Sequence, residues 1–263
     1  MSKSRVTLTV KNNIGYVALN RPDKHNALDF EMFLAIDKVI KKVRKDKSIR
    51  VVILCGTGES FCSGLDVKSI LTKPSSALRL LFKWLPGNAN LAQRVTIGWR
   101  RLNVPVIAVL HGKCWGGGMQ IALGADFRIA SSDCSLAIME SRWGLIPDMG
   151  GTLALYECVR GDMAMQLAMT SEVIDASRAQ SLGLVTHVDD EPIKAAEALA
   201  EKLLNRSPDA IRIIKGMYHK IWCSKGRRIL AKESLNQVKI LLGKNQRIAV
   251  KRETGKPETP YHY

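Results

Sequence analysis

The chain has 263 residues, of which 46% are hydrophobic and 24% charged, and its formal net charge is +16. A chain of this size can bury a large hydrophobic core and needs no disulfides to fold. No apolar run approaches the roughly 20 residues that cross a bilayer, so we expect no membrane insertion.

The excess of positive charge is the unusual feature of the composition. It attracts anions such as the phosphates of a cofactor, nucleic acid or a membrane surface. A basic surface that only keeps the protein in solution explains the charge equally well, because charge alone does not choose among partners.

The six cysteines form no Cys-x-x-Cys pair and no Cys/His cluster of the kind that binds zinc. They lie in apolar or glycine-rich stretches, which is typical of buried, reduced thiols. The first residues lead directly into a strand-like segment without an evident signal or transit peptide. We therefore expect a cytoplasmic protein without a bound metal.

The first segments predict a hairpin followed by a helix. Alternating apolar residues at 5–10 and 14–19 flank Asn12 and Asn13, which is typical of a β-hairpin. Residues 29–44 carry apolar side chains at helical spacing with lysines between them. This pattern predicts an amphipathic helix with a basic outer face.

Continuous apolar runs follow at 51–54 and 106–110, each rich in β-branched residues and bounded by Gly or Pro. They predict strands that are buried on both faces, as in an α/β core. Further strands are predicted at 127–130 and 135–138, and a short buried helix at 117–125.

From about residue 161 the pattern becomes helical. Helices are predicted at 162–169, 176–182, 191–204, 208–222 and 228–242, with Asp175, Ser207 and Ser224 as cap residues. The tail 251–263 contains prolines and charges and is expected to be irregular. We therefore expect an α/β core over residues 1–195 and a C-terminal helical region over residues 196–263.

Three glycine-containing segments at predicted transitions from strand to helix are candidate binding sites. They cover residues 61–67, 111–120 and 139–152. The first two follow buried strands, so the backbone N–H groups of Leu65 and Gly117 are expected at helix N-termini, where two converging donors would form an oxyanion hole. One such segment alone is as readily explained by a tight turn, but three in order are not.

These segments, with one further upstream, carry a family resemblance. The four motifs are Asn20-Arg21-Pro22 followed by Asn26-Ala27, Ser63-Gly64-Leu65-Asp66, the triple glycine 116–118, and Glu140 upstream of Gly150-Gly151-Thr152. The chain thereby resembles the crotonase (enoyl-CoA hydratase/isomerase) superfamily over nearly its whole length. The resemblance implies a spiral of ββα units and a helical region that forms trimers, commonly paired into hexamers.

The resemblance also implies an acyl-coenzyme A enzyme in which Leu65 and Gly117 donate their backbone N–H groups to the thioester oxygen. Negative charge develops on that oxygen during the reaction, and one preorganised donor is worth about 2.7–4 kcal/mol of barrier. Coenzyme A is then part of the substrate, and no separate cofactor is expected. The residues implied in substrate binding are Lys24, Ala27, Cys62, Gly64, Leu65, Asp66, Val67, Trp115, Gly116, Gly117 and Gln120.

The acid/base candidates lie in the second and third glycine segments. Hydratases of the family place two glutamates beside the substrate, and the first of those positions is Gln120 here. An amide does not exchange protons at neutral pH, so Gln120 could only position a water or the thioester. The second glutamate is present as Glu140, and Asp148 stands where dienoyl-CoA isomerases of the family carry an aspartate. Without the resemblance, both carboxylates would be assigned to a strand end and a turn.

Several functions stay open. The glutamine at position 120 favours an isomerase that shifts the double bond of an enoyl- or dienoyl-CoA, with Glu140, and Asp148 in support, as the proton shuttle. The alternatives are a hydratase that uses Glu140 while Gln120 positions water, and a catalytically silent acyl-CoA-binding relative. RNA binding by the basic helix is implied by one relative of the family, but a solvated helix face is the favoured interpretation because no aromatic residues are interleaved.

One further segment and three single residues are also assigned. Residues 71–94, rich in leucine and aromatic side chains, are interpreted as an acyl-binding flap, and Trp115 as a wall of the acyl pocket. His25 and His111 have no serine or cysteine at triad spacing and are assigned to turns or packing.

Overall fold

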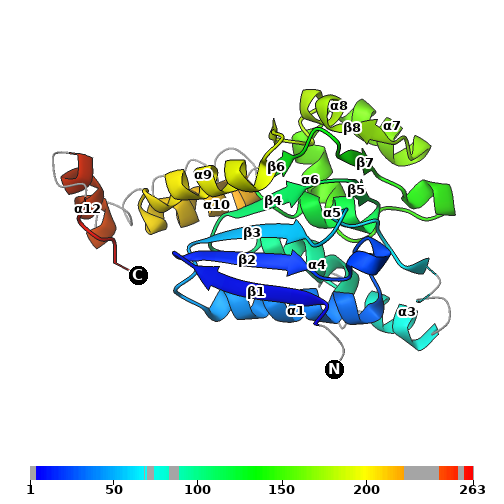
Figure 1. Cartoon of the computed structure of the whole chain (residues 1–263), viewed down its shortest axis with the longest axis horizontal. Helices are drawn as coiled ribbons and strands as arrows, with labels where there is room; N and C mark the ends of the chain where they lie inside the picture. Colours follow the sequence, from blue (N-terminus) through cyan, green and yellow to red (C-terminus); the bar gives the residue numbers. More distant parts are fainter. Residues whose placement is uncertain are drawn as a thin grey trace.

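The computed structural model describes residues 4–67, 69, 74–82, 89–221, 243–253 and 258–262. Within these residues the chain forms two β-sheets with helices packed around them (Figure 1). The larger sheet has six strands in the order β1-β2-β3-β4-β6-β9, and the smaller one has three in the order β5-β7-β8. The mixed α/β class predicted from the sequence is confirmed.

The larger sheet begins with the predicted hairpin. Strands β1 (Val6–Lys11) and β2 (Ile14–Leu19) are antiparallel, and the turn residues Asn12 and Asn13 have φ values of 51° and 62°. Asparagine tolerates this left-handed region, which the tight turn requires. The remaining strands, all parallel to their neighbours, are β3 (Val51–Gly56), β4 (Val106–Leu110), β6 (Phe127–Ala130) and β9 (His187–Val188).

Helices cover both faces of the larger sheet, as a buried parallel sheet requires. Alternate residues of β3 point to opposite faces. Val52 joins the main core with α1 (Phe30–Lys45), whereas Ile53 joins a second cluster with Ala200 of α9 (Pro192–Leu204). Figure 1 shows α1 along one side of the strands and α9 on the other.

The amphipathic helix predicted at 29–44 is α1. Its N-cap is Asp29, whose side chain accepts a hydrogen bond of 2.8 Å from the N–H of Met32. The apolar stripe is buried against the sheet and the basic residues form the exposed face, as predicted. These exposed basic residues are Lys38, Lys41, Lys42, Arg44 and Lys45.

The smaller sheet contains β5 (Lys113–Trp115), β7 (Ser135–Ala137) and β8 (Ile174–Asp175). Eight further α-helices and two 3-10 helices lie in the described residues. They are α3 (Pro74–Leu81), α4 (Leu91–Arg100), α5 (Gly117–Leu123), α6 (Gly151–Cys158), α7 (Gly161–Thr170), α8 (Ala176–Ser181), α10 (Pro208–Ile221), α12 (Lys244–Glu253), η1 (Pro22–Lys24) and η2 (Glu140–Trp143).

The region after residue 161 is not entirely helical, so that prediction was wrong in part. Strands β8 and β9 have two residues each, and β9 extends the edge of the larger sheet beside β6. Two residues are too few to produce a period in the sequence. The tail predicted to be irregular from 251 begins inside α12, which extends to Glu253. The predicted helix 228–242, Ser224 and Cys223 lie outside the described residues.

The predicted flap at 71–94 is described only in part. Its described part contains the helix α3 and the first residues of α4, which begins at the capping box of Asn90 and Gln93. The other residues of this segment, 71–73 and 83–88, lie outside the described residues. The acyl-binding role of the segment stays a prediction.

A buried ionic cluster ties α10 to the α/β core. The Nζ atom of Lys215 lies 2.7 Å from Oδ2 of Asp126 and donates a hydrogen bond of 2.8 Å to the carbonyl of Val104. The ring of His219 also contacts the Asp126 carboxylate. Burial opposes ionisation of Asp126, but the charge of Lys215 and the contact with His219 outweigh it and hold its pKa below the ordinary value.

The predicted boundary between residues 195 and 196 falls within α9 (Pro192–Leu204), and the division into two domains stays a prediction. In the part of the chain that the structure describes, no helix is both long enough and apolar enough to span a membrane.

Candidate active site

A β-bridge, made of backbone hydrogen bonds at Cys62 and Cys114, joins the first two glycine segments. The N–H of Cys62 donates to the carbonyl of Lys113 at 2.9 Å, and the N–H of Trp115 donates to the carbonyl of Cys62 at 3.0 Å, so that Cys62 pairs with Cys114. The segments follow β3 and β4, which are parallel and therefore end at the same edge of the sheet. The structure thus brings segments 61–67 and 111–120 side by side.

A second β-bridge, between Leu28 and Leu65, leaves the N–H group of Leu65 free of the bridging hydrogen bonds. Leu28 pairs with Leu65 through the carbonyl of Gly64, at 2.8 Å from the N–H of Leu28, and through the N–H of Asp66, at 3.1 Å from its carbonyl. In a parallel pair the flanking residues make these bonds, so the N–H of Leu65 points to the other side. Within the described residues no hydrogen bond from this N–H is found.

Gly117 lies directly against the same segment. It is the first residue of α5, so its N–H has no partner within the helix. A methyl group placed on Gly64 would lie 3.5 Å from the nitrogen of Gly117 and 2.9 Å from the carbonyl oxygen of Trp115. The preceding Gly116 has φ 50° and ψ −120°, a conformation that a side chain rarely permits. Gly64, the residue before the predicted donor Leu65, therefore lies against Gly117, the second predicted donor.

The turn at residues 21–26 is closed by a buried amide. The side chain of Asn26 accepts a hydrogen bond of 2.7 Å from the N–H of Arg21 and donates to the carbonyls of Thr57 and Ser60 at 2.9 and 2.8 Å. All of these groups are backbone, so only an amide of this length satisfies them together. This explains why the first motif contains an asparagine at position 26.

This turn lies beside the first glycine segment. The N–H of Ser63 donates to the carbonyl of His25 at 2.9 Å, and the imidazole of His25 lies 3.0 Å from the hydroxyl of Ser60. Lys24 is exposed at the end of η1, and Ala27 is half-buried. The structure therefore places Lys24 and Ala27 next to residues 62–67 and gives His25 a turn contact. Their role in substrate binding stays a prediction.

Arg21 connects the turn to Asp66, a link that sequence reasoning missed. Its Nη1 atom donates to Oδ2 of Asp66 at 2.8 Å and to the carbonyl of Ala27 at 3.1 Å. Burial raises the pKa of Asp66, but the hydrogen bonds from Arg21 and from the N–H of Ser69 lower it by more. Asp66 is thus an ionised group that positions the loop. The motif contained Arg21, but no local pattern indicated a partner 45 residues away.

The side chains of two predicted binding residues contact other protein groups. The thiol of Cys62 is buried and donates to the carbonyl of Asn26 at 3.1 Å, and burial raises its pKa to about 12. The indole N–H of Trp115 donates to the hydroxyl of Ser135 at 3.2 Å, and Nζ of Lys113 lies 5.3 Å from the centroid of the indole ring. Cys62 therefore contributes its backbone to this site and its side chain to the core. Val67 is half-buried.

The side chain of Gln120 is fixed at both ends. It is 1% exposed, and its Oε1 atom accepts hydrogen bonds from the N–H groups of Met149 and Gly151 at 3.0 and 3.2 Å. Because two backbone donors face the oxygen, the amide nitrogen must face the opposite way, where it donates to Oε1 of Glu140 at 2.6 Å. Gln120 therefore connects the second and third glycine segments.

Glu140 is the carboxylate that this amide orients. It is the first residue of η2, half-buried, and a methyl group on Gly116 would lie 3.7 Å from its Oε1 atom. The Oε2 atom is buried and has no hydrogen-bond partner among the described residues. Burial raises the pKa of Glu140, the hydrogen bond from Gln120 lowers it, and the charge of Asp148 raises it, with a net increase. A raised pKa makes it easier for this carboxylate to hold a proton during a reaction and return it.

Asp148 lies within electrostatic range of Glu140 on the same loop. Its side chain is exposed, yet partial burial of the carboxylate raises its pKa. The other loop residue that sequence reasoning missed is Met149, whose sulfur would lie 3.0 Å from a methyl group on Gly117. Met149 therefore packs against the first turn of α5. Its apolar type carried no chemical signal in the sequence.

Metal ligands do not gather in the described part of the chain, where no group of three or more His, Cys, Asp or Glu side chains is arranged to hold an ion. His111 contacts the carbonyl of Gly58 at 3.0 Å.

The chain matches known proteins over most of its length. Residues 9–258 match the family model described as enoyl-CoA hydratase/isomerase. The chain is 34% identical over 213 residues to (E)-benzylidenesuccinyl-CoA hydratase of Thauera aromatica, a match that covers 80% of each chain. It is 33% identical over 218 residues to short-chain-enoyl-CoA hydratase of Clostridium acetobutylicum, covering 82% of this chain and 81% of the relative. The crystal structure of an enoyl-CoA hydratase from Polaromonas sp. JS666 superposes with a TM-score of 0.88 at 26% identity, over 98% of this chain and 99% of that one.

Proposed function

This chain belongs to the enoyl-CoA hydratase/isomerase family, and on that premise we propose that it shifts the double bond of an enoyl- or dienoyl-CoA thioester. As a member of the family it is an acyl-CoA enzyme, and coenzyme A enters as part of the substrate. The proposal assigns proton transfer to Glu140 and stabilisation of the enolate to the backbone N–H groups of Leu65 and Gly117.

The contact that carries the proposal is the hydrogen bond from Gln120 to Glu140. Both ends of the Gln120 amide are occupied by protein groups, and an amide has no proton to exchange at neutral pH. Only Glu140 of this pair can therefore accept and return a proton. A double-bond shift needs one such group, whereas the two-glutamate scheme of hydration needs two.

The proposed chemistry uses the groups as follows. The carboxylate of Glu140 removes a proton from one carbon of the acyl chain, and the charge moves to the thioester oxygen. The N–H groups of Leu65 and Gly117, which have no hydrogen-bond acceptor among the described residues, would donate to that oxygen. Protonated Glu140 then returns the proton to a second carbon. The raised pKa of Glu140 supports both steps, because the protonated form is less costly in a half-buried place.

Asp148 has a supporting role in the proposal. Its negative charge is one of the causes that raise the pKa of Glu140. Its own pKa is also raised, so it could exchange a proton with a dienoyl-CoA substrate. In such a substrate the carbon that loses the proton and the carbon that gains one lie further apart. The exposed position of Asp148 is compatible with that role only when a substrate or another chain covers it.

A hydratase is the second candidate, favoured by the names of the relatives. Both the Thauera and the Clostridium proteins are described as hydratases. In that case Glu140 would activate a water molecule and return its proton, and the Gln120 amide would only hold the glutamate in place. A silent acyl-CoA-binding protein is disfavoured, because a half-buried glutamate with a raised pKa is costly to keep without a use.

The test compares three substrates with the purified full chain. We expect turnover of 3-enoyl- or dienoyl-CoA, and slow or absent hydration of 2-enoyl-CoA. The Glu140→Gln variant should lose 10²–10⁴-fold of the isomerase rate, the usual contribution of a general base. The matched control is Glu201→Gln, an exposed residue of α9 outside the three glycine segments. Rapid hydration of 2-enoyl-CoA that does not respond to Glu140→Gln would overturn the proposal.

We also propose that copies of the chain form a trimer or hexamer. Most exposed large hydrophobic residues in the described part of the chain lie between residues 143 and 173. They are Trp143, Leu145, Ile146, Leu153, Tyr156, Met165, Met169 and Val173, defined here as the apolar face. An exposed apolar surface of this kind is typical of a protein–protein contact. The residues of this face come earlier in the sequence than residues 196–263, the region that was predicted to form the trimer.

RNA binding stays a prediction that is not favoured. The basic residues of α1 are exposed and solvated, and no aromatic side chain of that helix lies among them to stack on a base.

A further inference from the structure

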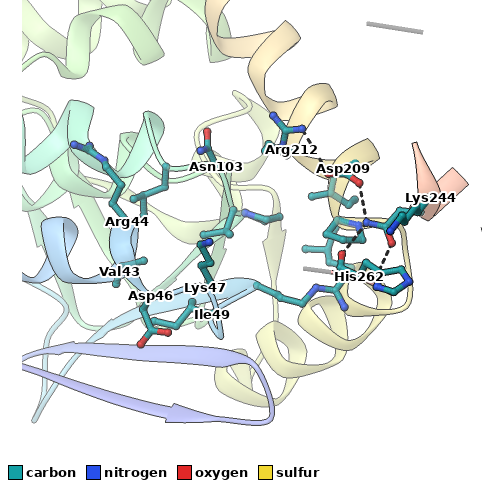
Figure 2. A pocket seen from close by; sticks show the side chains of 18 residues that line it. Val43, Arg44, Asp46, Lys47, Ile49, Asn103, Asp209, Arg212, Lys244 and His262 are labelled. Carbon is teal, nitrogen blue, oxygen red and sulfur yellow. Dashed lines mark hydrogen bonds and ion pairs between the residues drawn. The ribbon is translucent and has the colours of Figure 1, made fainter. Parts of the chain in front are cut away.

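A cavity of about 490 Å³ is shown in Figure 2. It lies at the N-terminal ends of β3 and β4, whereas the glycine segments follow the C-terminal ends of these strands. Its walls come from the end of α1, the residues that precede β3 and β4, the first turn of α10, and α12 with the tail. Figure 2 shows Arg44, Lys47, Arg212 and Lys244 around it. Its volume is within the range of pockets that bind small organic molecules.

The cavity has an excess of positive charge among the residues that the structure describes. Its charged lining residues are Arg44, Lys47, Arg50, Arg212, Lys244, Asp46 and Asp209. Both carboxylates are engaged, since Asp46 accepts hydrogen bonds from Ser48 and Asp209 from Asn245. In the described residues, Arg44, Lys47 and Lys244 have no ion-pair partner.

Helix capping does not explain all of these cations. A cation near the C-terminus of α1 stabilises that helix end, which accounts for Arg44. Lys244 is the first residue of α12, and Arg212 lies in the first turns of α10, where the helix dipole disfavours positive charge. Two helix N-termini and the unpaired cations therefore lie around one cavity, an arrangement that attracts anions.

The outer wall of the cavity is held by a buried side chain. The amide of Asn245 donates to Oδ2 of Asp209 at 2.7 Å and to the carbonyl of His262 at 2.8 Å, and its oxygen accepts from the N–H of His262 at 2.8 Å. Tyr261 is buried beside it, with Arg50 5.7 Å from its ring centroid. These contacts fix α12 and the tail against α10, so the cavity has a defined shape.

We propose that this cavity binds an organic anion with two or more phosphate groups, such as a nucleoside diphosphate. Three unpaired cations call for more than one negative charge, and arginine and helix N-termini are favourable partners of phosphate. The floor is apolar, formed by Ile49, Leu102 and Val104, and suits the non-phosphate part of such a molecule. The site lies apart from the candidate active site and does not depend on the function proposed for it.

The test is calorimetric titration of the purified full chain with ADP, pyrophosphate and adenosine at low salt. ADP and pyrophosphate should bind and adenosine should not. Lys47→Glu and Lys244→Glu should each weaken ADP binding about tenfold, because each reverses a charge at the partly solvated site. The matched control is Lys45→Glu, an exposed lysine at the same end of α1 that does not line the cavity. Its affinity should stay within about twofold of the parent.

A second titration separates the cavity from the acyl-CoA site. Butyryl-CoA, which has no double bond to move, is added to saturation before ADP, and the ADP affinity should not change. Thermal unfolding of each variant confirms that it is folded. The proposal is overturned by any of four results: ADP fails to bind at about 1 mM, adenosine binds as well as ADP, Lys45→Glu weakens ADP as much as Lys47→Glu, or butyryl-CoA displaces ADP.

Discussion

The side-chain nitrogen of Gln120 lies 2.6 Å from Oε1 of Glu140, and two backbone N–H groups hold the other end of the same amide. Of these two side chains only Glu140 can exchange a proton, because the amide of Gln120 does not titrate. A carboxylate at position 120 would face Glu140 directly and would retain the two backbone donors. A single substitution therefore separates the two candidate reactions.

Gln120→Glu should convert the pair into two carboxylates that share one proton. Like charges at this distance raise the apparent pKa of the pair, since both cannot ionise readily. We expect the isomerase rate at pH 7 to fall about tenfold or more and the hydration of 2-enoyl-CoA to rise, because a second exchangeable proton becomes available. The measurement is the ratio of the two products between pH 5 and pH 9.

The control for this substitution is Gln166→Glu, which makes the same chemical change at an exposed position of α7. It should leave both rates unchanged. An unaltered product ratio and pH profile in Gln120→Glu would mean that position 120 does not take part in the acid/base step.

Removing the charge of Asp148 should move the pH dependence of the reaction. Burial is the largest cause of the raised pKa of Glu140, and the charge of Asp148 adds to it. A general base must be ionised, so kcat/KM should rise with pH through a value above the ordinary 4.5 of a glutamate. In Asp148→Asn this acid limb should shift to lower pH, because one cause of the increase is gone.

Asp162→Asn removes an exposed carboxylate from α7 and serves as the control. Its acid limb should coincide with that of the parent. If the limb in Asp148→Asn stays in place, the two carboxylates are not coupled and the role given to Asp148 is wrong.

Local patterns predicted much of the fold because the causes are local. The hairpin at Asn12 and Asn13 and the start of α1 at Asp29 depend on residues within four positions of each other. Side-chain type and spacing were sufficient for these features. The position of Glu140 in the site came from the family resemblance instead, and the structure brings Gly116 against Glu140.

Other parts of the site depend on contacts between distant residues. The hydrogen bond from Arg21 to Asp66 and the backbone β-bridge between Cys62 and Cys114 each join positions about 50 residues apart. Periodic patterns in the sequence do not indicate such contacts. The sequence also did not show that the side-chain oxygen of Gln120 would accept hydrogen bonds from two backbone N–H groups. Its chemistry was clear from its type, but its partners follow from how α6 begins beside α5.

Gly118→Ala should destabilise the protein and disrupt the site. A methyl group at position 118 would lie 2.4 Å from the carbonyl oxygen of Cys62, a backbone atom that cannot move without breaking the bridge to Cys114. We expect a loss of about 1–3 kcal/mol in the free energy of unfolding, measured in urea. Gly161→Ala is the control, since no atom of the described residues lies within 4 Å of its added methyl group. It should be neutral or stabilising by about 0.4–1 kcal/mol, and equal losses in both variants would contradict the packing assigned to Gly118.

Lys215→Met should detach α10 from the core. The substitution leaves the buried carboxylate of Asp126 without its main cation, and breaking a buried pair in this way costs about 3–5 kcal/mol. The double variant Asp126→Asn with Lys215→Met should lose less than Lys215→Met alone, which urea unfolding can show. Lys194→Met, at an exposed position of α9, should change stability by no more than about 0.5 kcal/mol.

The same pair predicts a pH dependence of stability. The pKa of Asp126 is lowered in the folded protein, so its contribution is present above the ordinary value of 3.8 and is lost as pH falls below it. Asp126→Asn should therefore flatten the decline of stability between pH 4 and pH 2. An unchanged decline would show that other carboxylates govern acid unfolding.

Substituting one exposed tyrosine on each of two surfaces, the apolar face and the helix α10, can show which surface joins the copies of the chain. Tyr156 belongs to the apolar face on α6 and is 74% exposed, whereas Tyr218 belongs to the C-terminal helix α10 and is 60% exposed. If copies meet through the apolar face, Tyr156→Arg should place a charge in a buried contact and weaken association by about 2 kcal/mol or more, or about 30-fold. Sedimentation velocity over a range of protein concentrations measures this shift.

Tyr218→Arg makes the same chemical change and should leave the oligomer intact. The opposite result, with dissociation only in Tyr218→Arg, would transfer the interface to the C-terminal helices, as the sequence first implied. The apolar face also includes Leu145 and Ile146, which lie on the loop between Glu140 and Asp148. A second copy seated there would cover the exposed Asp148, so Tyr156→Arg should reduce activity in proportion to the fraction of monomer. Full activity in the monomer would show that the loop needs no neighbouring copy to hold its carboxylates.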